Sequence, residues 1–244
     1  IGQVAGNVNF APNAAELDLL LAWVVCQAKS GNNFTPKTTT PSAAEASRYL
    51  RAARDGDWDL YSGVYVQQAT FQCSEGSPLT LGLQLVGTSE ATGSTVPGTL
   101  TAVNDDEGPY VMTDCVLTVG GTAYPFRQFT LQYANAWDVR HNNSLTPSRI
   151  TLVDREVSVS LALPHGDTTA LYAPALAGVA VVATFTHAVQ TGKSLTITMP
   201  KVQTPREAKP FGQRGQASTL AWNGVVRRQD TSTAIITFAN DSTA

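Results

Sequence analysis

The sequence predicts a mainly β protein built around an antiparallel, half-buried sheet, and three observations support this fold class. Apolar and polar residues alternate along many short segments, which is typical of strands with one buried face. Segments rich in Gly, Pro and Ser separate these strands, as turns and loops require. Only 14% of the residues are charged, against about 25% in an ordinary soluble domain. Either the surface is largely covered by something other than water, or a β-rich surface uses Thr, Ser, Asn and Gln in place of charges.

The first element that breaks the alternation is a helix over about residues 13–28. Asn13 is a suitable N-cap, and Glu16, three residues later, completes a capping box. Most apolar residues of this helix form a stripe that should lie on the sheet, but Leu19, Trp23 and Cys26 are apolar outside that stripe. We therefore expect the helix to be covered on two sides. Complete burial in its own domain is the alternative.

The stretch that follows is compatible with two structures. Ser42 and Glu45 form a second capping box among good helix formers, so local propensity favours a helix. Asp55-Gly56 is a dipeptide typical of two-residue hairpin turns, so the flanking arms could equally be strands. Both interpretations stay open on the residues alone.

The strands are expected in chain order after this stretch. Residues 79–85 alternate most clearly, with four leucines on one face and small or polar residues on the other. Residues 114–133 should form a hairpin, because Gly120-Gly121 supplies the positive φ angles of a two-residue turn, and its second strand should continue to the end of this segment. Further strands are expected at residues 157–163, 179–187, 194–199, 218–222 and 233–238.

A second, short helix is expected at about residues 168–177, after Asp167 and before Gly178. Pro174 lies in its interior and should kink or divide it. Segments rich in Gly, Pro, Ser or charged residues are expected as long loops at about residues 29–57, 88–108 and 204–216. The whole chain, residues 1–244, is expected to form a single β domain.

The sequence carries no recognisable catalytic or metal-binding motif, so we expect no catalytic residue, no metal and no cofactor. It has three histidines and three cysteines, and neither set has the spacing of a nucleophile with its base, a zinc site or a disulfide framework. Both glycine-rich phosphate-loop patterns are absent. The cysteines lie among apolar neighbours, so buried free thiols are expected.

Charge and hydropathy exclude further classes of partner. The net charge is −3, so nothing global attracts nucleic acid or an anionic membrane. The longest apolar run, Leu17 to Cys26, is shorter than the roughly 20 residues that a membrane-spanning helix needs. The clustered acids Asp105, Asp106 and Glu107 lack the alternate spacing of a calcium loop, so a solvated acidic loop is the better interpretation.

A second charged cluster, Asp154-Arg155-Glu156, directly precedes the strand at residues 157–163. Paired carboxylates are the usual groups of general acid and base catalysis, but they need a cleft that shifts their pKa values. Consecutive residues of a strand point to opposite faces, so these three side chains cannot converge on one substrate. We interpret them as the charged beginning of a strand.

From about Val8 to the C-terminus, the order of the segments resembles the major tail tube proteins of long-tailed bacteriophages. The resemblance rests on "APNAAELDLLLAWVV", "YSGVYVQQATFQCSEGSPLTLGLQLVG", "PYVMTDCVLTVGGTAYPFRQFTLQYANAWDVRHNNSLTPSRITLVDREVSVSLALP", "TALYAPALAG" and "SLTITMPKVQ", in this order. Each stretch alone is common among β proteins, and the ordered set carries the resemblance.

The resemblance implies an antiparallel β-sandwich or partly open β-barrel with the first helix flanking it. It also implies hexameric rings that stack into the tail tube, with strands of neighbouring copies merging into an inner barrel that passes double-stranded DNA. Implied partners are other copies of the chain and the tape measure, terminator and distal tail proteins, in a virion tail assembled in the host cytoplasm. The family has no catalytic residues to carry over. It favours a hairpin at Asp55-Gly56, although helix-prone alanines precede this pair.

The resemblance also makes several residues candidates for contacts between copies. Apolar residues on the helix would be covered by a neighbour, acidic residues near two loop tips would join one ring to the next, and the second charged cluster would pair across a subunit boundary. The candidates are Leu19, Trp23, Asp55, Asp57, Asp105, Asp106, Glu107, Asp154, Arg155 and Glu156.

Two other classes of function stay open. A virion-surface or carbohydrate-binding β-sandwich would need exposed aromatic residues in a groove, with Trp58, Tyr61 and Tyr65 as candidates. A hydrolase on a β scaffold would depend on residues such as His165 or Asp167. Among structural proteins, a capsid-decorating or tail-terminator protein differs from a tube protein in whether its rings stack without end.

Overall fold

The computed structural model describes residues 4–36, 46–54, 57–91, 107–143, 147, 149–164, 178–204, 219–230 and 234–242. These residues include the helix α1 (Ala14–Val25) and the 3-10 helix η1 (Met112–Asp114). The strands are β1 (Val4–Phe10), β2 (Asn33–Phe34), β3 (Arg48–Arg54), β4 (Asp57–Ser74), β5 (Thr80–Gly87), β6 (Ser89–Ala91), β7 (Cys115–Val119), β8 (Thr122–Tyr124), β9 (Gln128–Arg140), β10 (Arg149–Pro164), β11 (Val179–Thr186), β12 (Ser194–Gln203), β13 (Thr219–Val226) and β14 (Thr237–Asp241). The described chain is therefore mainly β, as the alternation predicted.

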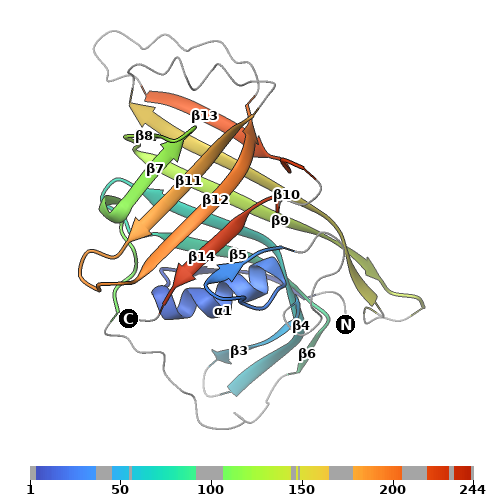
Figure 1. The fold of residues 1–244 in the computed structure, drawn as a ribbon. Helices are drawn as coiled ribbons and strands as arrows, with labels where there is room; N and C mark the ends of the chain where they lie inside the picture. The colour runs from blue at the N-terminus through green and yellow to red at the C-terminus, as the bar shows by residue number, and fades with distance from the viewer. Residues whose placement is uncertain are drawn as a thin grey trace.

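The strands form one antiparallel sheet that folds over on itself without closing (Figure 1). Its order is β1-β5-β4-β9-β10-β13-β12-β11-β7-β8, with β14 alongside β12 and β2. The sheet turns a corner between β13 and β12, which share only the pairs Val202↔Val226 and Gln203↔Val225. The first layer consists of β1, β5, β4, β9, β10 and β13. The second layer consists of β12, β11, β7 and β8 together with β14, and it crosses the first (Figure 1). The expected sandwich with a flanking helix is confirmed.

Aromatic side chains from both layers meet between them and form the centre of the core. The ring of Phe238 in β14 lies 5.3 Å from that of Phe71 in β4 and 6.4 Å from that of Tyr133 in β9, centroid to centroid. The ring of Phe185 in β11 lies 6.4 Å from that of Phe129 in β9. All five are buried. Because aromatic side chains bury the largest apolar areas, these contacts hold the two layers together.

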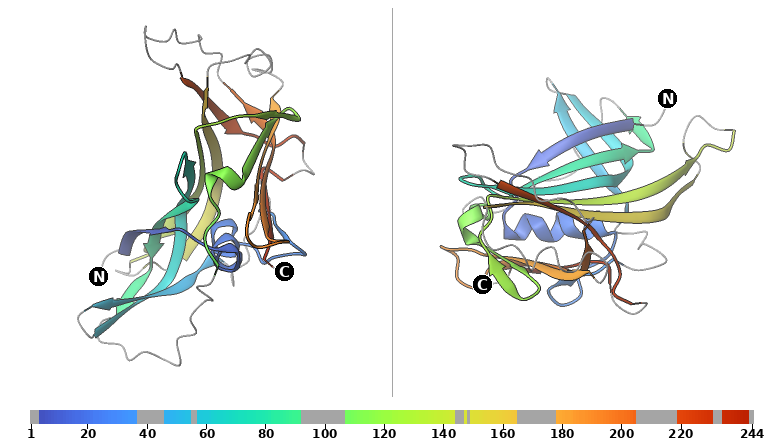
Figure 2. Two further views of the ribbon diagram at one scale, coloured as in Figure 1. Left: turned by 90° about the vertical axis from the view of Figure 1, so that its left-hand side faces the viewer. Right: turned by 90° about the horizontal axis from the view of Figure 1, so that it is seen from above.

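Helix α1 lies at one end of the sandwich, against β14 and β4 (Figures 1 and 2). The predicted capping box is present: Glu16 N donates to Asn13 Oδ1 at 2.8 Å, and Asn13 N donates to Glu16 Oε2 at 3.0 Å. The helix ends at Cys26, which adopts the left-handed conformation with a φ of 57°. The helix expected at about 13–28 is thus confirmed. The second helix, expected at about 168–177, lies outside the described residues.

The loop expected over residues 29–57 is wrong in part, because the segment contains β2 and β3. Arg54 of β3 pairs with Asp57 of β4, so β3 and β4 form an antiparallel pair, while the predicted turn residues Asp55-Gly56 lie outside the described residues. The hairpin interpretation therefore holds over β3 and the helix interpretation does not. Pairing with β4 outweighs the helix propensity of the alanines, since propensity is a weak preference that tertiary contacts override.

The other two expected loops are described only in small part. The segment at 88–108 begins with the short strand β6, which pairs with β4, so the loop interpretation is wrong for these three residues. The segments 92–106 and 205–216 lie outside the described residues.

The hairpin at Gly120-Gly121 is confirmed, with φ angles of 60° and 83° and Val119 paired with Thr122. Its second strand, however, ends at Tyr124 and does not continue through residues 129–133 as expected. Those residues belong to β9, which pairs with β4 and β10 instead. The adjacent Pro125 has no backbone N–H and interrupts the ladder at this point.

Two parts of the sheet project from the sandwich. β4 bends at Gly63, which has a φ of 57°, and a Cβ there would lie 2.4 Å from Thr88 Oγ1. Beyond this bend, β4 pairs with β3 and β6 in place of β5. Strands β9 and β10 extend past the other strands as a two-stranded arm (Figure 2), because β13 pairs with β10 only from Ser158 onward.

Candidate functional site

The outward surface of the first layer is covered by neutral polar side chains. Strand alternation puts the apolar residues in the core, and the register aligns the outward residues in rows across the sheet. One row is Thr80–Gln72–Thr130–Ser160–Asn223, and the next is Asn9–Gly82–Thr70–Gln132–Ser158–Val225. We call this surface the amide face, and define it by Asn7, Asn9, Gln68, Thr70, Gln72, Thr80, Gln84, Gln128, Thr130, Gln132, Ser158, Ser160 and Asn223.

Hydrogen bonds within the amide face join side chains to each other and to the backbone. Ser160 Oγ donates to Asn223 Oδ1 at 2.6 Å, across the β10–β13 pair. Gln128 Nε2 donates to Thr130 Oγ1 at 3.4 Å, and Thr80 Oγ1 donates to the backbone oxygen of Gln72 at 3.2 Å. The surface therefore presents amide and hydroxyl dipoles but no formal charge, so it attracts neither sign of ligand over a long range.

Two shallow depressions lie on the amide face, and neither contains a titratable side chain. One, of about 220 Å³, centres on Gly82 and is bordered by Asn9 and Gln72. The other, of about 320 Å³, is bordered by Gln132 and Asn223. General acid–base and nucleophilic catalysis both need a titratable or activated group in the site. These depressions can accept hydrogen bonds and water, and they offer no group for a chemical step.

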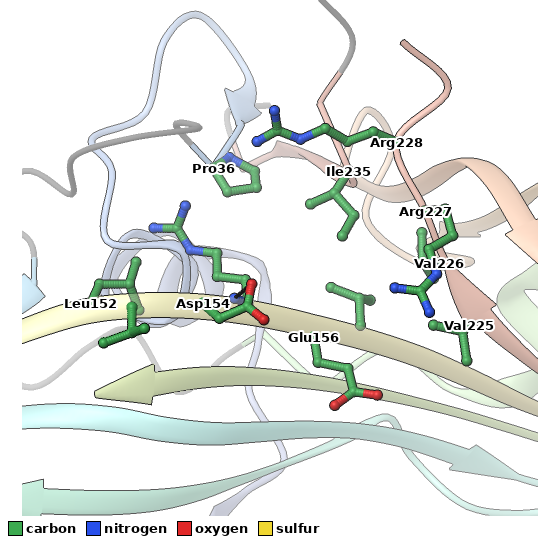
Figure 3. Close-up of a pocket in the computed structure, with 12 residues that line it drawn as sticks. Pro36, Leu152, Asp154, Glu156, Val225, Val226, Arg227, Arg228 and Ile235 are labelled. Carbon is green, nitrogen blue, oxygen red and sulfur yellow. Dashed lines mark hydrogen bonds between the residues drawn. The ribbon is translucent and has the colours of Figure 1, made fainter. Parts of the chain in front are cut away.

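Charge begins at the margin of the amide face, where β13 leaves β10. The row Asn7–Gln84–Gln68–Ala134 ends at Glu156, whose carboxylate is exposed. A cleft of about 310 Å³ opens at this margin. Its walls carry the carboxylates of Asp154 and Glu156 on β10 and the guanidinium groups of Arg227 and Arg228 after β13 (Figure 3).

The three residues of the charged cluster divide between two faces, as the alternation predicted. Asp154 and Glu156 are exposed, whereas Arg155 points inward. Arg155 Nη2 donates to the backbone oxygen of Val25 at 3.3 Å, and its Nε donates to Asn135 Oδ1 at 3.3 Å. A cation at the C-terminus of a helix is favourable because it faces the negative end of the helix dipole. Arg155 thus joins α1 to β10 within its own chain, which weakens the expectation of a subunit contact at this residue.

The two apolar helix residues expected at an interface have different environments. Trp23 is buried in its own chain, and its Nε1 donates to the backbone oxygen of Val64 at 3.1 Å. Burial within the domain, the alternative interpretation, therefore describes Trp23. Leu19 is 62% exposed and stays a candidate for covering by a neighbour.

The acidic residues expected at ring-to-ring contacts are mostly outside the described part of the chain. Asp55, Asp105 and Asp106 are not described, and only the backbone of Asp57 is. Glu107 forms an ion pair with Lys193, whose side chain is buried. A pair formed inside the chain makes Glu107 a poor candidate for a contact between rings.

Two of the three aromatic candidates for a carbohydrate site pack within the fold, and the third, Trp58, is half-buried on β4. The ring of Tyr65 lies 4.9 Å from that of Trp137, and Tyr61 packs against the core. Among the described residues, Tyr49 is the one exposed aromatic side chain, and it lies on β3, away from the amide face. An aromatic platform for sugar rings is therefore not formed on the amide face.

The cysteines are unsuited to chemistry. Burial raises the pKa of Cys26 to about 11, although the nearby Arg155 acts in the opposite direction, and burial with Asp114 nearby raises the pKa of Cys73 to about 11. Burial also raises the pKa of Cys115. Thiols with raised pKa values stay protonated at neutral pH and are weak nucleophiles. In the described ranges, no group of three or more His, Cys, Asp or Glu side chains is arranged to hold a metal ion.

Comparison with known proteins gives the family. Over the ranges that the structure describes, no helix has both the length and the apolar character needed to cross a bilayer. None of the curated proteins compared with the chain matches it. A family model described as phage tail tube protein matches residues 2–232, nearly the whole chain. The chain therefore belongs to the phage tail tube protein family, the structural proteins of the virion tail.

Proposed function

We propose that copies of this chain form hexameric rings that stack into the tail tube, and that the amide face lines the channel for double-stranded DNA. The family membership supports the tube, and the neutral amide face is the observation that supports the assignment of the channel wall. It spans neighbouring strands of the first layer, from β1 to β13, and its central rows contain no charged residue among the described positions.

The chemistry of this face suits a channel through which DNA must move. Lysine or arginine side chains would bind phosphates and release counterions, so each contact would add affinity that must be broken for the DNA to advance. Amide and hydroxyl groups exchange hydrogen bonds between water and phosphate at little net cost. A neutral, hydrated wall therefore excludes specific binding while it keeps the DNA solvated.

The same proposal defines the partners and the place of action. The chain contacts copies of itself within and between rings, and it contacts the tape measure, terminator and distal tail proteins. Assembly takes place in the host cytoplasm, and the role is structural, without catalysis. Leu19, which is exposed on α1, is the apolar residue that we assign to a contact between copies.

Electron microscopy of the purified wild-type protein tests the assembly. We expect negatively stained tubes, or rings that stack as the protein concentration rises, with six-fold symmetry in end-on averages. A protein that stays a compact monomer across concentration and salt would contradict the tube, and another symmetry would contradict the hexamer alone. Rings that never stack would favour a terminator or decorating protein.

Contacts between rings are tested by charge reversal. We propose that Asp55, Asp57, Asp105 and Asp106 lie at these contacts, because they are acidic residues in or near predicted loop tips. Replacing them by lysine should shorten the tubes or lower their dissociation temperature. Tubes of unchanged length and stability would contradict this assignment without affecting the rest of the proposal.

A further inference from the structure

The first layer ends in two strand edges that have no partner among the described strands. At one end, β1 pairs with β5 alone. At the other end, β10 pairs with β9 along its length, but β13 covers its second side only from Ser158 to Pro164. The segment Arg149 to Val157 therefore has no strand partner on that side among the described strands, although Arg155 N donates to Asp154 Oδ1 at 2.8 Å. Open edges offer unpaired N–H and C=O groups and are a liability unless something covers them.

The open edge of β10 faces the cleft described above (Figure 3). Leu152 to Val157 line one wall of this cleft, and Val225 to Arg228 line the other. The backbone irregularity between Leu152 and Asp154 leaves Val153 69% exposed beside it. A cleft whose wall is a free strand edge is the geometry that accepts an added strand, with main-chain hydrogen bonds supplying the affinity.

We propose that β1 of a second copy pairs with the Arg149–Val157 segment of β10, and that the two strands run parallel. This inference rests on the proposed function, because it takes the ring as the assembly. The contact joins the β1 edge of one copy to the β10 edge of the next.

The direction follows from the topology of the first layer. Between β1 and β10 lie four antiparallel pairings, β1–β5, β5–β4, β4–β9 and β9–β10. Four reversals restore the starting direction, so β1 and β10 run the same way. A rotation about the ring axis keeps the direction of every strand along that axis, so a head-to-tail contact brings these two edges together in parallel.

Position, length and charge agree with this pairing. The row that starts at Asn7 reaches Glu156, so the two edges lie at the same level of the sheet. β1 has seven residues, about 23 Å of strand, and the open segment of β10 is slightly longer. Residues 4–10 carry no charge. The acidic and basic side chains of the cleft therefore neither repel β1 nor require an opposite charge from it. A two-fold contact of β1 with β1 would be antiparallel and would stop at a dimer.

Disulfide cross-linking of assembled tubes tests both the edges and the direction. Pairs of cysteines are introduced at exposed positions: A5C with D154C, N7C with E156C, N7C with D154C, N9C with E156C and N9C with D154C. After mild oxidation, a non-reducing gel reports covalent dimers and longer ladders. If the strands are parallel and in the first register, both A5C–D154C and N7C–E156C form covalent dimers. If they are parallel with a stagger of two residues, both N7C–D154C and N9C–E156C do so instead. Antiparallel pairing links N9C–D154C together with N7C–E156C.

The controls separate this contact from others. Each single-cysteine variant and the wild type, which keeps its three cysteines, should stay monomeric on the gel. The pair Q84C with Q132C lies on the amide face but on inner strands, and it should give no ladder. Linkage of N7C with itself would indicate a two-fold contact and overturn the inference.

A measurement on the wild type keeps the inference testable even where a variant fails to assemble. The backbone amides of β1 and of Arg149–Val157 should gain hydrogen-exchange protection of at least tenfold when rings form. Tubes that form without this protection, or with only the antiparallel set linked, overturn the inference and leave the tube itself standing. Wild-type protein that forms no ring or tube overturns the proposed function and the inference together.

Discussion

The two outward faces of the sandwich carry different uncharged residues, and the difference distinguishes residues that suit a strand from residues that suit a function. The amide face of the first layer is built from long amide side chains, most of which are exposed, together with serines and threonines. The second layer presents what we call the threonine face: Thr118, Val182, Thr184, Thr196, Thr198 and Thr237, all half-buried. Both faces avoid charge, but the threonine face uses the β-branched residues that a sheet favours.

This difference indicates where sheet stability alone selects the residues. On the threonine face, β-branched side chains stabilise the strands through contacts with their cross-strand neighbours. On the amide face, Asn7, Asn9 and Asn223 occupy strand positions although asparagine is depleted in strands. Asparagine at these positions lowers the β propensity of the strands, so the amide groups are explained better by a function at the surface than by strand stability. This supports the assignment of the amide face to the channel wall.

Introducing positive charge on the amide face is expected to have the largest effect. Gln132→Lys would place six lysines in each ring of a hexameric tube, facing the channel. Short double-stranded DNA should then bind to the tubes, and its affinity should fall by about 10³ between 50 and 200 mM salt, as six phosphate contacts predict. Fluorescence anisotropy over a salt series measures this. Thr196→Lys on the threonine face is the matched control, and equal binding to its tubes would contradict the assignment of the channel wall.

Removing an aromatic side chain shared by both layers should destabilise both faces together. Phe238→Ala deletes the ring that contacts Phe71 and Tyr133. We expect the free energy of unfolding to fall by about 3–5 kcal/mol, from lost burial and the cavity left behind. Urea unfolding followed by tryptophan fluorescence measures this loss. A cost below about 1 kcal/mol would mean that the layers are held together elsewhere.

The inward-pointing arginine should matter more for stability than an exposed one. Arg155→Met keeps much of the side-chain volume but removes the hydrogen bonds to Val25 and Asn135. We expect a loss of about 2 kcal/mol, the range for hydrogen bonds made by a charged group. Arg140→Met, which removes an exposed pair with Asp138 at 2.6 Å, should cost less than about 1 kcal/mol. Similar costs for both variants would contradict the structural role of Arg155.

Exchanging residues between the two faces should give small changes of opposite sign. Gln132→Thr should stabilise the fold and Thr196→Gln should destabilise it, each by no more than about 1 kcal/mol, because β propensity spans that range. Thermal unfolding of the two variants beside the wild type measures the signs. The same sign for both would show that propensity does not distinguish the faces.

The buried thiols predict an effect that is confined to high pH, a loss of stability above pH 9. Burial raises the pKa of Cys26 and Cys73 from 9.0 to about 11 in the folded protein. Folding holds these protons more tightly than the unfolded chain does, so the contribution is complete below pH 9 and is lost as pH rises towards 11. Denaturant unfolding across this window should show the decline, and Cys26→Ala should make it shallower. A decline that begins below pH 8 would have another cause.

Much of the fold could be predicted from local patterns, because local geometry determines them. The capping box at Asn13 and Glu16 needs only residues three apart, and it forms as expected. The Gly120-Gly121 turn needs only two residues that tolerate positive φ. Alternation at residues 157–163 was sufficient to predict which side chains enter the core.

The amide face could not be predicted as a site, although the alternation was visible. Residues 79–85 showed a small or polar side, but the partners of that side lie on strands distant in the chain, and their register sets the rows. A prediction would have required the strand order. The glutamines, serines and asparagines in outward positions of several strands were the available signal.

The sequence by itself determined the class of fold, the position of the first helix, the alternation along the strands and the low proportion of charged residues. Tertiary structure decided which side each element shows to its neighbours. Trp23 is enclosed by β4 while Leu19 is exposed one turn away, and pairing with β4 makes β3 a strand despite its helix formers. Arg155 turns inward because the end of α1 lies beneath β10. Local propensities are small, and contacts between residues far apart in the chain outweigh them.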